Sequence, residues 1–133
     1  MTELRPLLGT RVVDVTSSLA GPTATQLLAA LGADVVKIEP LTGDHARAWG
    51  PPFLDGEGAM FLASNAGKRS LAVELRNDRG REIVLRLADG ADVFLQSLRP
   101  GAAERHGLGA TELRARNPRL VHCSIGHSGR RAR

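Results

Sequence analysis

The sequence has little of several residue types, and each scarcity narrows what the protein can be. It contains one cysteine, Cys123, so the chain cannot form a disulfide framework or a cysteine-based metal site by itself. Three phenylalanines, one tryptophan and no tyrosine require a core built mainly from aliphatic side chains. Because aromatic residues are not interleaved with basic ones, nucleic acid is a poor choice of partner.

Long apolar runs are also missing. No apolar stretch reaches the roughly 18 residues of a membrane-spanning helix, and the first residues do not have the pattern of a secretory signal peptide. We therefore expect a cytoplasmic protein with no membrane partner. The four histidines share no metal-ligand spacing, so we expect no metal site; they are His45, His106, His122 and His127.

The charge is modest. The formal net charge is +4, and Arg130, Arg131 and Arg133 stand at the extreme end of the chain. The rest of the chain is only mildly basic, which is compatible with a small polyanionic ligand. A length of 133 residues with 42% apolar content predicts one domain with a real core.

The stretch Arg11 to Pro40 carries the clearest structural signal. A β-branched run is followed by a loop of small residues, Thr16 to Gly21, then by a helix-periodic run from Pro22 to Leu31, and then by a second β-rich run from Val35 to Ile38. This order and length predict a βαβ crossover unit. Pro22 suits the first helical position, and Gly32 is expected to end the helix in a left-handed conformation.

The loop Thr16 to Gly21 is the first candidate ligand site. In a parallel α/β sheet, segments that leave the carboxyl ends of strands face the ligand crevice, and the N-terminus of the following helix favours an anion. The loop also offers hydroxyl groups and small residues that allow close approach. The alternative is an ordinary βαβ unit without a specific ligand.

Strands and helices continue to alternate after this unit, which predicts an α/β fold with a doubly wound, mostly parallel sheet. An irregular segment rich in glycine and proline, Leu41 to Met60, comes first, and we call it the excursion. We expect Trp49 and Phe53 to anchor it. Asp14, Asp34 and Asp92 lie at strand starts or within strands, where structural roles are expected. The further elements expected are helices at Ala59 to Ala66, Asp78 to Ala88 (capped by Asn77) and Ala102 to His106, a helical turn capped by Thr111, and strands at Ser70 to Leu75, Asp92 to Leu95 and Leu120 to Ile125.

The last eight residues, GHSGRRAR, form an atypical tail at 126–133. They have no periodic apolar face that could cover the final strand, although a parallel strand normally needs cover on both faces. We therefore expect a sheet that is incomplete at the C-terminus, in a chain that is a fragment or whose reading frame changed near Ile125.

Four blocks of sequence together resemble the N-terminal part of the family III CoA-transferases, which include formyl-CoA and carnitine CoA-transferases and α-methylacyl-CoA racemase. The blocks are VVDVTSSLAGPTATQLLAALGADVVKIEP, NAGKRSLAVELRNDRGREIVLRLADGADVFLQSLRPG, ERHGLGATEL and NPRLVHCSI, and the similarity runs from about Leu8 to Ile125. The resemblance implies that residues 1–133 are the N-terminal part of a Rossmann-like, CoA-binding large domain. It also implies an interlocked homodimer.

The resemblance implies a CoA-binding surface made from short segments spread along the chain. The loop Thr16 to Ala20 would approach the pantetheine and thioester end, and Pro40 would lie near the nucleotide. The segment around Val73 and Arg76, and later Arg105, would serve the adenine and phosphates. For each arginine, a solvated surface charge is the alternative. The full set of expected CoA-binding residues is Thr16, Ser17, Ser18, Leu19, Ala20, Pro40, Val73, Arg76, Ser97, Leu98 and Arg105.

In this family a carboxylate attacks an acyl-CoA, forms a mixed anhydride, and passes the CoA to a carboxylic acid acceptor. Acyl-CoA is thus a substrate, and no covalently bound cofactor is expected. The acylated aspartate is expected beyond residue 133, so the chain holds no catalytic residue and should be inactive alone. Many relatives also have Glu-Asn-Phe where this chain has Gln96-Ser97-Leu98, and formyl-CoA transferase-like members have His-Val-Gln in place of Ser17-Ser18-Leu19.

Three alternatives stay open. A racemase-type member would use His and Asp for proton exchange, and His127 only superficially resembles such a histidine. A dinucleotide-binding oxidoreductase domain would use Glu39 on a ribose, but the first turn lacks G-x-G-x-x-G. A non-catalytic interaction fragment is the third alternative, because an incomplete sheet leaves an unpaired edge.

Overall fold

The fold is built on a five-stranded parallel sheet. The computed structural model describes residues 4–126, so His127 and nearly all of the expected tail lie outside the described residues. The strands lie in the order β5-β2-β1-β6-β7, and each neighbouring pair is parallel. Their bounds are β1 Arg11–Val15, β2 Asp34–Glu39, β5 Arg69–Ala72, β6 Val93–Gln96 and β7 Val121–Ser124.

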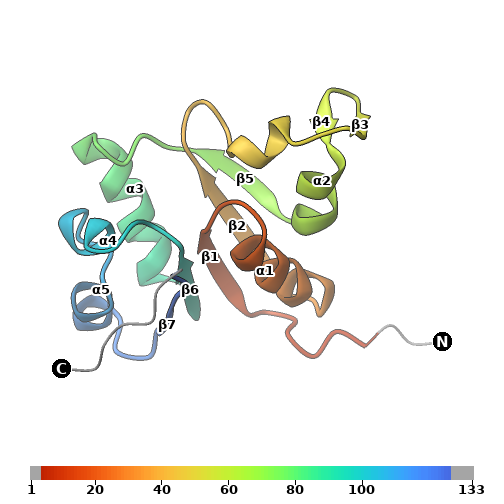
Figure 1. Cartoon of the computed structure of the whole chain (residues 1–133). Coiled ribbons are helices and arrows are strands. Elements are labelled where there is room, and N and C mark those ends of the chain that lie inside the picture. Colours follow the sequence, from red (N-terminus) through yellow and green to blue (C-terminus); the bar gives the residue numbers. More distant parts are fainter. Residues whose placement is uncertain (1–3, 127–133) are drawn as a thin grey trace.

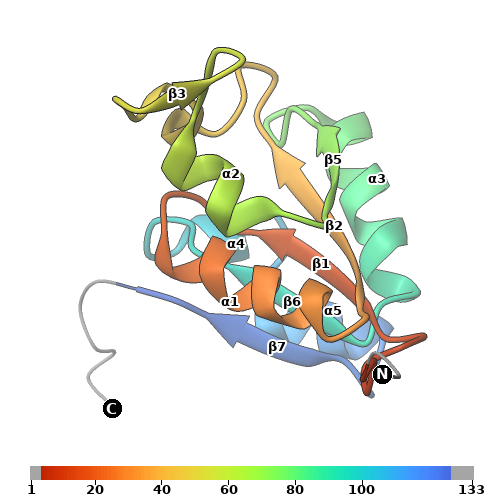
Figure 2. The same ribbon diagram turned by 90° about the vertical axis from the view of Figure 1, so that its right-hand side faces the viewer.

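Helices cover both faces of this sheet, which confirms the predicted doubly wound α/β class (Figures 1 and 2). Helix α1 (Ala20–Ala30) lies on one face, with α2 (Ala59–Asn65) packed beside it. The other face carries α3 (Asp78–Asp89), α4 (Ala102–Arg105) and α5 (Ala110–Arg116). The chain therefore runs outward from the central strand β1 through β2 to β5, and then crosses through α3 to β6 on the other side of β1 and outward to β7.

The helix boundaries agree with the sequence signals at some ends and not at others. Asn77 caps α3 by accepting a hydrogen bond from the Arg79 amide at 2.8 Å, and Gly32 has a φ of +103°, both as predicted. The prediction for Pro22 is wrong, because α1 begins two residues earlier, at Ala20. Proline is still tolerated there, because the first four helical N–H groups have no partner within the helix.

Two further predictions need correction at element ends. Thr111 does not cap α5, because Gly109 occupies the cap position and provides no side-chain hydrogen bond. Strand β5 ends at Ala72 rather than Leu75. The chain then leaves the sheet edge, although the Val73 amide still donates to the Glu39 carbonyl at 2.8 Å.

The excursion after β2 is compact but is not anchored by its aromatic residues. It contains a 3₁₀ helix, η1 (His45–Ala48), and a small hairpin of β3 (Phe53–Leu54) and β4 (Glu57–Gly58). Trp49 and Phe53 stay 40% and 52% exposed, so the expectation that they anchor the segment is wrong. Polar contacts hold it instead, together with the Arg47 guanidinium, which lies 4.1 Å from the centroid of the Phe61 ring.

The core consists of two clusters, one on each face of the sheet. Because successive side chains of a strand point to opposite faces, Val12 belongs to the cluster under α1 and Val13 to the cluster under α3. Both clusters are aliphatic apart from Phe94, which is fully buried and stacks on His122 with 5.5 Å between ring centroids. The predicted aliphatic core is confirmed.

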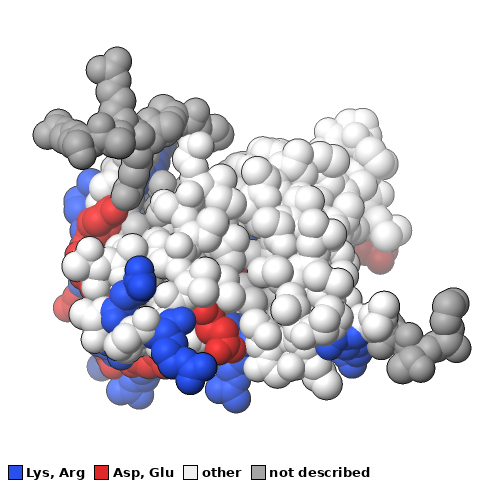
Figure 3. All heavy atoms as spheres, turned by 90° about the horizontal axis from the view of Figure 1, so that it is seen from below, with Lys and Arg blue, Asp and Glu red and all other residues white. Residues whose placement is uncertain are grey.

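Some surface charges of opposite sign are paired with one another. The face seen from below in Figure 3 carries basic and acidic side chains beside one another, and a broad area of that face carries neither. Exposed ion pairs join Arg86 to Glu82 at 2.9 Å and Arg116 to Asp89 at 2.6 Å. Such exposed pairs contribute little to stability, so the fold depends on its interior.

Truncation of Phe94 to alanine should destabilise the fold by about 3–5 kcal/mol, because it removes a fully buried aromatic ring and leaves a cavity. Chemical denaturation followed by circular dichroism measures this loss. Phe53→Ala is the matched control, and its half-exposed ring predicts a change below about 1 kcal/mol. Equal losses in the two variants would contradict the assignment of Phe94 to the core.

Candidate functional site

A cavity of about 260 Å³ lies at the carboxyl ends of the strands. The segments after β1, β2, β5 and β6 enclose it, where ligands of open α/β sheets usually bind. The Ser17 amide donates to the Ser97 hydroxyl at 3.0 Å and so joins the segments after the neighbouring strands β1 and β6. The lining residues are Val15, Thr16, Ser17, Lys37, Ile38, Glu39, Pro40, Gly43, Asp44, His45, Val73, Glu74, Leu75, Ser97 and Leu98.

About half of the residues expected to bind CoA line this cavity. They come from four separate segments, which the sheet brings together, and they are Thr16, Ser17, Pro40, Val73, Ser97 and Leu98. Their gathering supports the predicted position of the site. Their contacts with a ligand stay a prediction.

The other expected residues lie outside the cavity lining. Ser18 is half-buried beside it, while Leu19 and Ala20 are exposed where α1 begins. Arg76 and Arg105 are exposed side chains on the segments that follow β5 and β6. Any role of these arginines therefore requires a ligand that extends out of the cavity.

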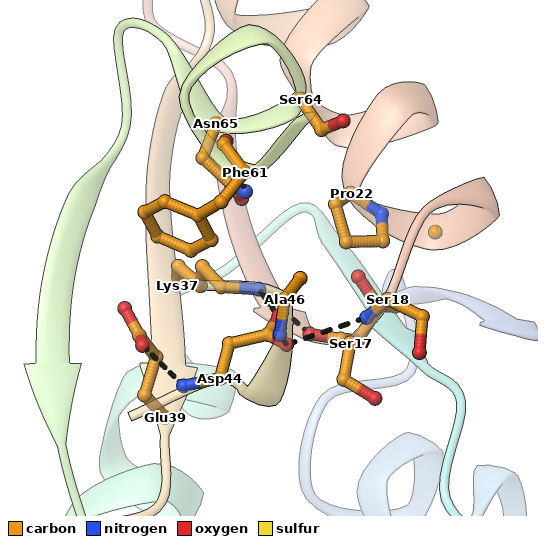
Figure 4. Close-up of polar contacts among 12 residues, drawn as sticks. Ser17, Ser18, Pro22, Lys37, Glu39, Asp44, Ala46, Phe61, Ser64 and Asn65 are labelled. Carbon is orange, nitrogen blue, oxygen red and sulfur yellow. Dashed lines mark hydrogen bonds and ion pairs between the residues drawn. The ribbon is translucent and has the colours of Figure 1, made fainter. Parts of the chain in front are cut away.

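A buried ionic network beneath the cavity was not anticipated from the sequence. The Lys37 ammonium lies 2.9 Å from Asp44 Oδ2 and donates to the Thr16 carbonyl at 2.8 Å. The side chains of this pair are only 2% and 1% exposed. Asp44 Oδ1 also accepts from the Ala46 amide at 2.9 Å, and the Ser18 amide lies 3.5 Å away (Figure 4). One pair therefore ties β2, the excursion and the loop after β1 together.

A second buried pair joins β1 to the segment before β5. The Lys68 ammonium lies 2.9 Å from Asp14 Oδ2 and also donates to the Pro22 carbonyl at 2.9 Å. Burial lowers the pKa of Lys68, although the nearby Asp14 carboxylate opposes this effect. Asp14 is fully buried and also accepts from the Thr25 hydroxyl at 2.6 Å and from the Thr16 amide at 2.9 Å. These contacts confirm the structural role expected for Asp14.

Glu39 is a further buried carboxylate of the network. Its carboxylate accepts two hydrogen bonds from Arg47 at 2.9 and 2.8 Å, one from the Asp44 amide at 2.8 Å and one from the Ser70 hydroxyl at 2.7 Å. Burial alone would raise the pKa of Glu39, but the bonds from Arg47, Asp44 and Ser70 outweigh it and lower the pKa to about 2. Glu39 is therefore held as a carboxylate.

One signal in the sequence could have revealed this network. Lys37 and Lys68 are the only lysines, although the chain has 18 basic residues. Both occupy buried positions where a compact ammonium with three donors fits better than a planar guanidinium. In a chain whose other basic residues are all arginine, a lysine indicates a position whose geometry requires an ammonium group.

Replacing Lys68 by methionine should cost about 3–5 kcal/mol of folding stability, because it leaves the Asp14 carboxylate buried without its cation. The adjacent Arg69→Met is the matched control. The Arg69–Asp34 ion pair is 69% and 49% exposed, so its loss should cost less than about 1 kcal/mol. Urea unfolding measures both variants, and a small loss for Lys68→Met would contradict the importance of the buried pair.

Acidification should remove the contribution of Glu39. Because its pKa is lower in the folded state, near 2, than the ordinary value of 4.5, the unfolded chain binds the proton first. The carboxylate therefore stabilises the fold fully above about pH 4.5, and this stability, on the order of 2–3 kcal/mol, is lost as the pH falls towards 2. Unfolding free energies measured between pH 6 and 2.5 should depend less steeply on pH in Glu39→Gln than in the unsubstituted chain, while the exposed Glu82→Gln should leave the slope unchanged.

The comparisons with known proteins agree on one family. The model of CoA-transferase family III matches residues 7–132. Succinyl-CoA:glutarate CoA-transferase of Mus musculus is 44% identical over 123 residues, which is 92% of this chain and 28% of the relative. Succinate–glutarate CoA-transferase of Agrobacterium fabrum is 45% identical over 127 residues, which is 90% of this chain and 32% of the relative.

Solved protein structures match this chain with similar sequence identity and similar coverage. Rv3272 from Mycobacterium tuberculosis has a TM-score of 0.88 and 42% identity, covering 98% of this chain and 36% of that one. A CAIB/BAIF family protein from Brucella suis has a TM-score of 0.87 and 44% identity, covering 93% and 35%. Among residues 4–126, no helix is long and apolar enough to cross a membrane. The chain spans about a third of the length of the relatives it matches, and it belongs to CoA-transferase family III.

Proposed function

We propose that this chain is the CoA-binding part of an acyl-CoA:carboxylate CoA-transferase and that the cavity at the carboxyl ends of the strands receives part of CoA. The observation that carries the proposal is the gathering of six expected CoA-binding residues around one cavity, in a chain that belongs to this family. The loop Thr16 to Ala20 faces the thioester end in this proposal. A carboxylic acid is the acceptor, and two subunits associate in the complete protein.

The names of the relatives support CoA as the ligand of this part of the protein. They include transferases for glutarate, mesaconate and oxalate, and each is 40–45% identical to this chain over about 120 residues. Their acids differ, while CoA appears in every one of these names. A segment that all of them share is therefore better suited to hold CoA than to select the acid.

The chemistry of the cavity fits a part of CoA. Ile38, Val73, Leu75 and Leu98 provide apolar walls suited to a ring or a pantetheine chain, and the hydroxyls of Ser17 and Ser97 lie at the joined segments. Lys37, the one lysine of the lining, is already paired with Asp44. The phosphates are therefore assigned to positive charges outside the cavity, for which Arg76 and Arg105 are the candidates.

The transfer reaction needs a nucleophilic carboxylate that we assign to sequence beyond residue 133. Asp14 and Asp44 are fully engaged with buried lysines, so neither is proposed as that nucleophile. The chain alone is accordingly proposed to bind CoA without transferring it, in the cytoplasm. A racemase-type reaction differs only in residues that this proposal places outside the chain.

A dinucleotide-binding oxidoreductase is the weaker candidate. It needs the Glu39 carboxylate to bind a ribose hydroxyl, but this carboxylate already accepts hydrogen bonds from Arg47, Ser70 and the Asp44 amide. Displacing these donors would leave buried groups unpaired. The hydrogen bonds that the Glu39 carboxylate already accepts therefore count against a nicotinamide cofactor as the ligand.

Saturating CoA should raise the melting temperature of the chain, with a stabilisation of about 2.7 kcal/mol when CoA is at 100 times its dissociation constant. Leu98→Glu should reduce this shift, because it adds a negative charge to the cavity wall against the phosphates of CoA. Leu27→Glu is the control, since Leu27 is 57% exposed on α1 and does not line the cavity. Scanning fluorimetry with CoA and with NADH tests the proposal, and a shift with NADH alone, or equal CoA shifts in both variants, would contradict it.

A further inference from the structure

Two polar side chains meet at the rim of the cavity, and the proposed CoA binding does not use their contact. Ser18 Oγ lies 2.9 Å from His45 Nε2, within hydrogen-bond distance. Ser18 belongs to the loop after β1, and His45 opens η1 in the excursion after β2. His45 itself lines the cavity, and its side chain is 59% exposed, so an incoming molecule can reach the pair.

A buried carboxylate stands behind the imidazole. Asp44 Oδ1 lies 3.7 Å from His45 Nδ1, on the ring nitrogen opposite the one that meets the serine. The Asp44 side chain is 1% exposed and is held by Lys37 and by the Ala46 amide, so its position does not depend on His45. The order hydroxyl, imidazole, carboxylate is that of the groups that activate a serine for nucleophilic attack, and at 3.7 Å Asp44 acts on His45 as a nearby negative charge rather than as a hydrogen-bond acceptor.

The backbone of Ser18 adds a second, independent observation. Its φ is +71°, a left-handed conformation that serine rarely adopts and that glycine would adopt without strain. Ser18 lies between the end of β1 at Val15 and the start of the 11-residue helix α1 at Ala20. A strained turn from strand to helix is also how α/β-hydrolases present a nucleophile, with helical N–H groups nearby for the developing oxyanion.

We propose that Ser18 is a nucleophile and His45 its general base in an acyl-transfer site for acyl thioesters and activated acyl esters. Ser18 Oγ attacks the acyl carbon while His45 Nε2 takes the hydroxyl proton. The bond from carbon to the leaving sulfur or oxygen then breaks, and His45 returns the proton to that leaving group. The acyl group stays on Ser18 as an ester.

Water completes the cycle. It attacks the ester carbon as His45 takes one of its protons, the bond to Ser18 Oγ breaks, and the serine recovers a proton from the imidazole. The net reaction is hydrolysis of the thioester or ester to a carboxylic acid and a free thiol or alcohol. No oxidant, metal or second carboxylate enters any step. The activity is therefore distinct from CoA transfer.

The test uses the 133-residue chain and p-nitrophenyl acetate, a substrate without any part of CoA. We expect a burst of p-nitrophenol, and peptide mass mapping should locate one acetyl group on Ser18. His45→Asn should slow acylation by about 100-fold, the usual scale for a general base. His106→Asn, at the end of α4 and outside the cavity lining, is the matched control and should keep the rate of the unsubstituted chain.

Ser18→Gly removes the hydroxyl while suiting the left-handed backbone, so it should fold at least as well as the unsubstituted chain and lose the acetyl adduct completely. Ser18→Cys should keep acylation. The proposal is overturned if no acetyl group is found on Ser18, or if Ser18→Gly retains the burst. Because the probe contains no CoA, a failure to bind CoA would leave this result unaffected, and the two proposals fail separately.

Discussion

Two buried lysine–aspartate pairs hold together the edge of the sheet where the strands end. Lys37 on β2 reaches Asp44 in the excursion and the carbonyl of Thr16, and Lys68 before β5 reaches Asp14 on β1. Each ammonium thus joins a strand to a segment from another part of the chain. A buried charge without its partner costs several kcal/mol, so none of these segments can move away independently. The cavity exists because its walls are the segments joined in this way.

The choice of cation follows the geometry of its acceptors. The Lys68 ammonium donates to the Asp14 carboxylate, the Pro22 carbonyl and the Asn65 side-chain oxygen, and three donors on one atom satisfy that arrangement. Glu39 instead presents its two oxygens to the planar fork of Arg47, whose side chain is 32% exposed. Because buried pairs are seldom more stabilising than apolar packing, the network contributes a defined loop arrangement more than net stability.

Most of the fold could be predicted from local patterns, whereas the network could not. Alternating β-branched residues and the Asn77 cap act over a few residues, so their signals are readable in the sequence. The Lys68–Asp14 contact joins residues 54 positions apart and arises only when β5 and β1 take their places in the sheet. The expected anchoring by Trp49 failed for a related reason, because the excursion is held by polar contacts such as that between Asp44 and the Ser18 amide, 26 positions apart.

Asp44 connects the two proposed activities of the site. It pairs with Lys37, accepts the amide hydrogen bond that starts η1, and stands behind His45 at the cavity rim. Because the buried Asp44 carboxylate accepts from the amides of Ser18 and Ala46, it holds the backbone that carries Ser18 and the turn that carries His45 together before any ligand arrives. A change in the buried network should therefore disturb the cavity and the rim together. A change confined to the exposed imidazole alters the cavity only at its rim and leaves the buried network in place, so the protein can gain or lose acyl-ester chemistry without rebuilding the rest of the cavity proposed for CoA.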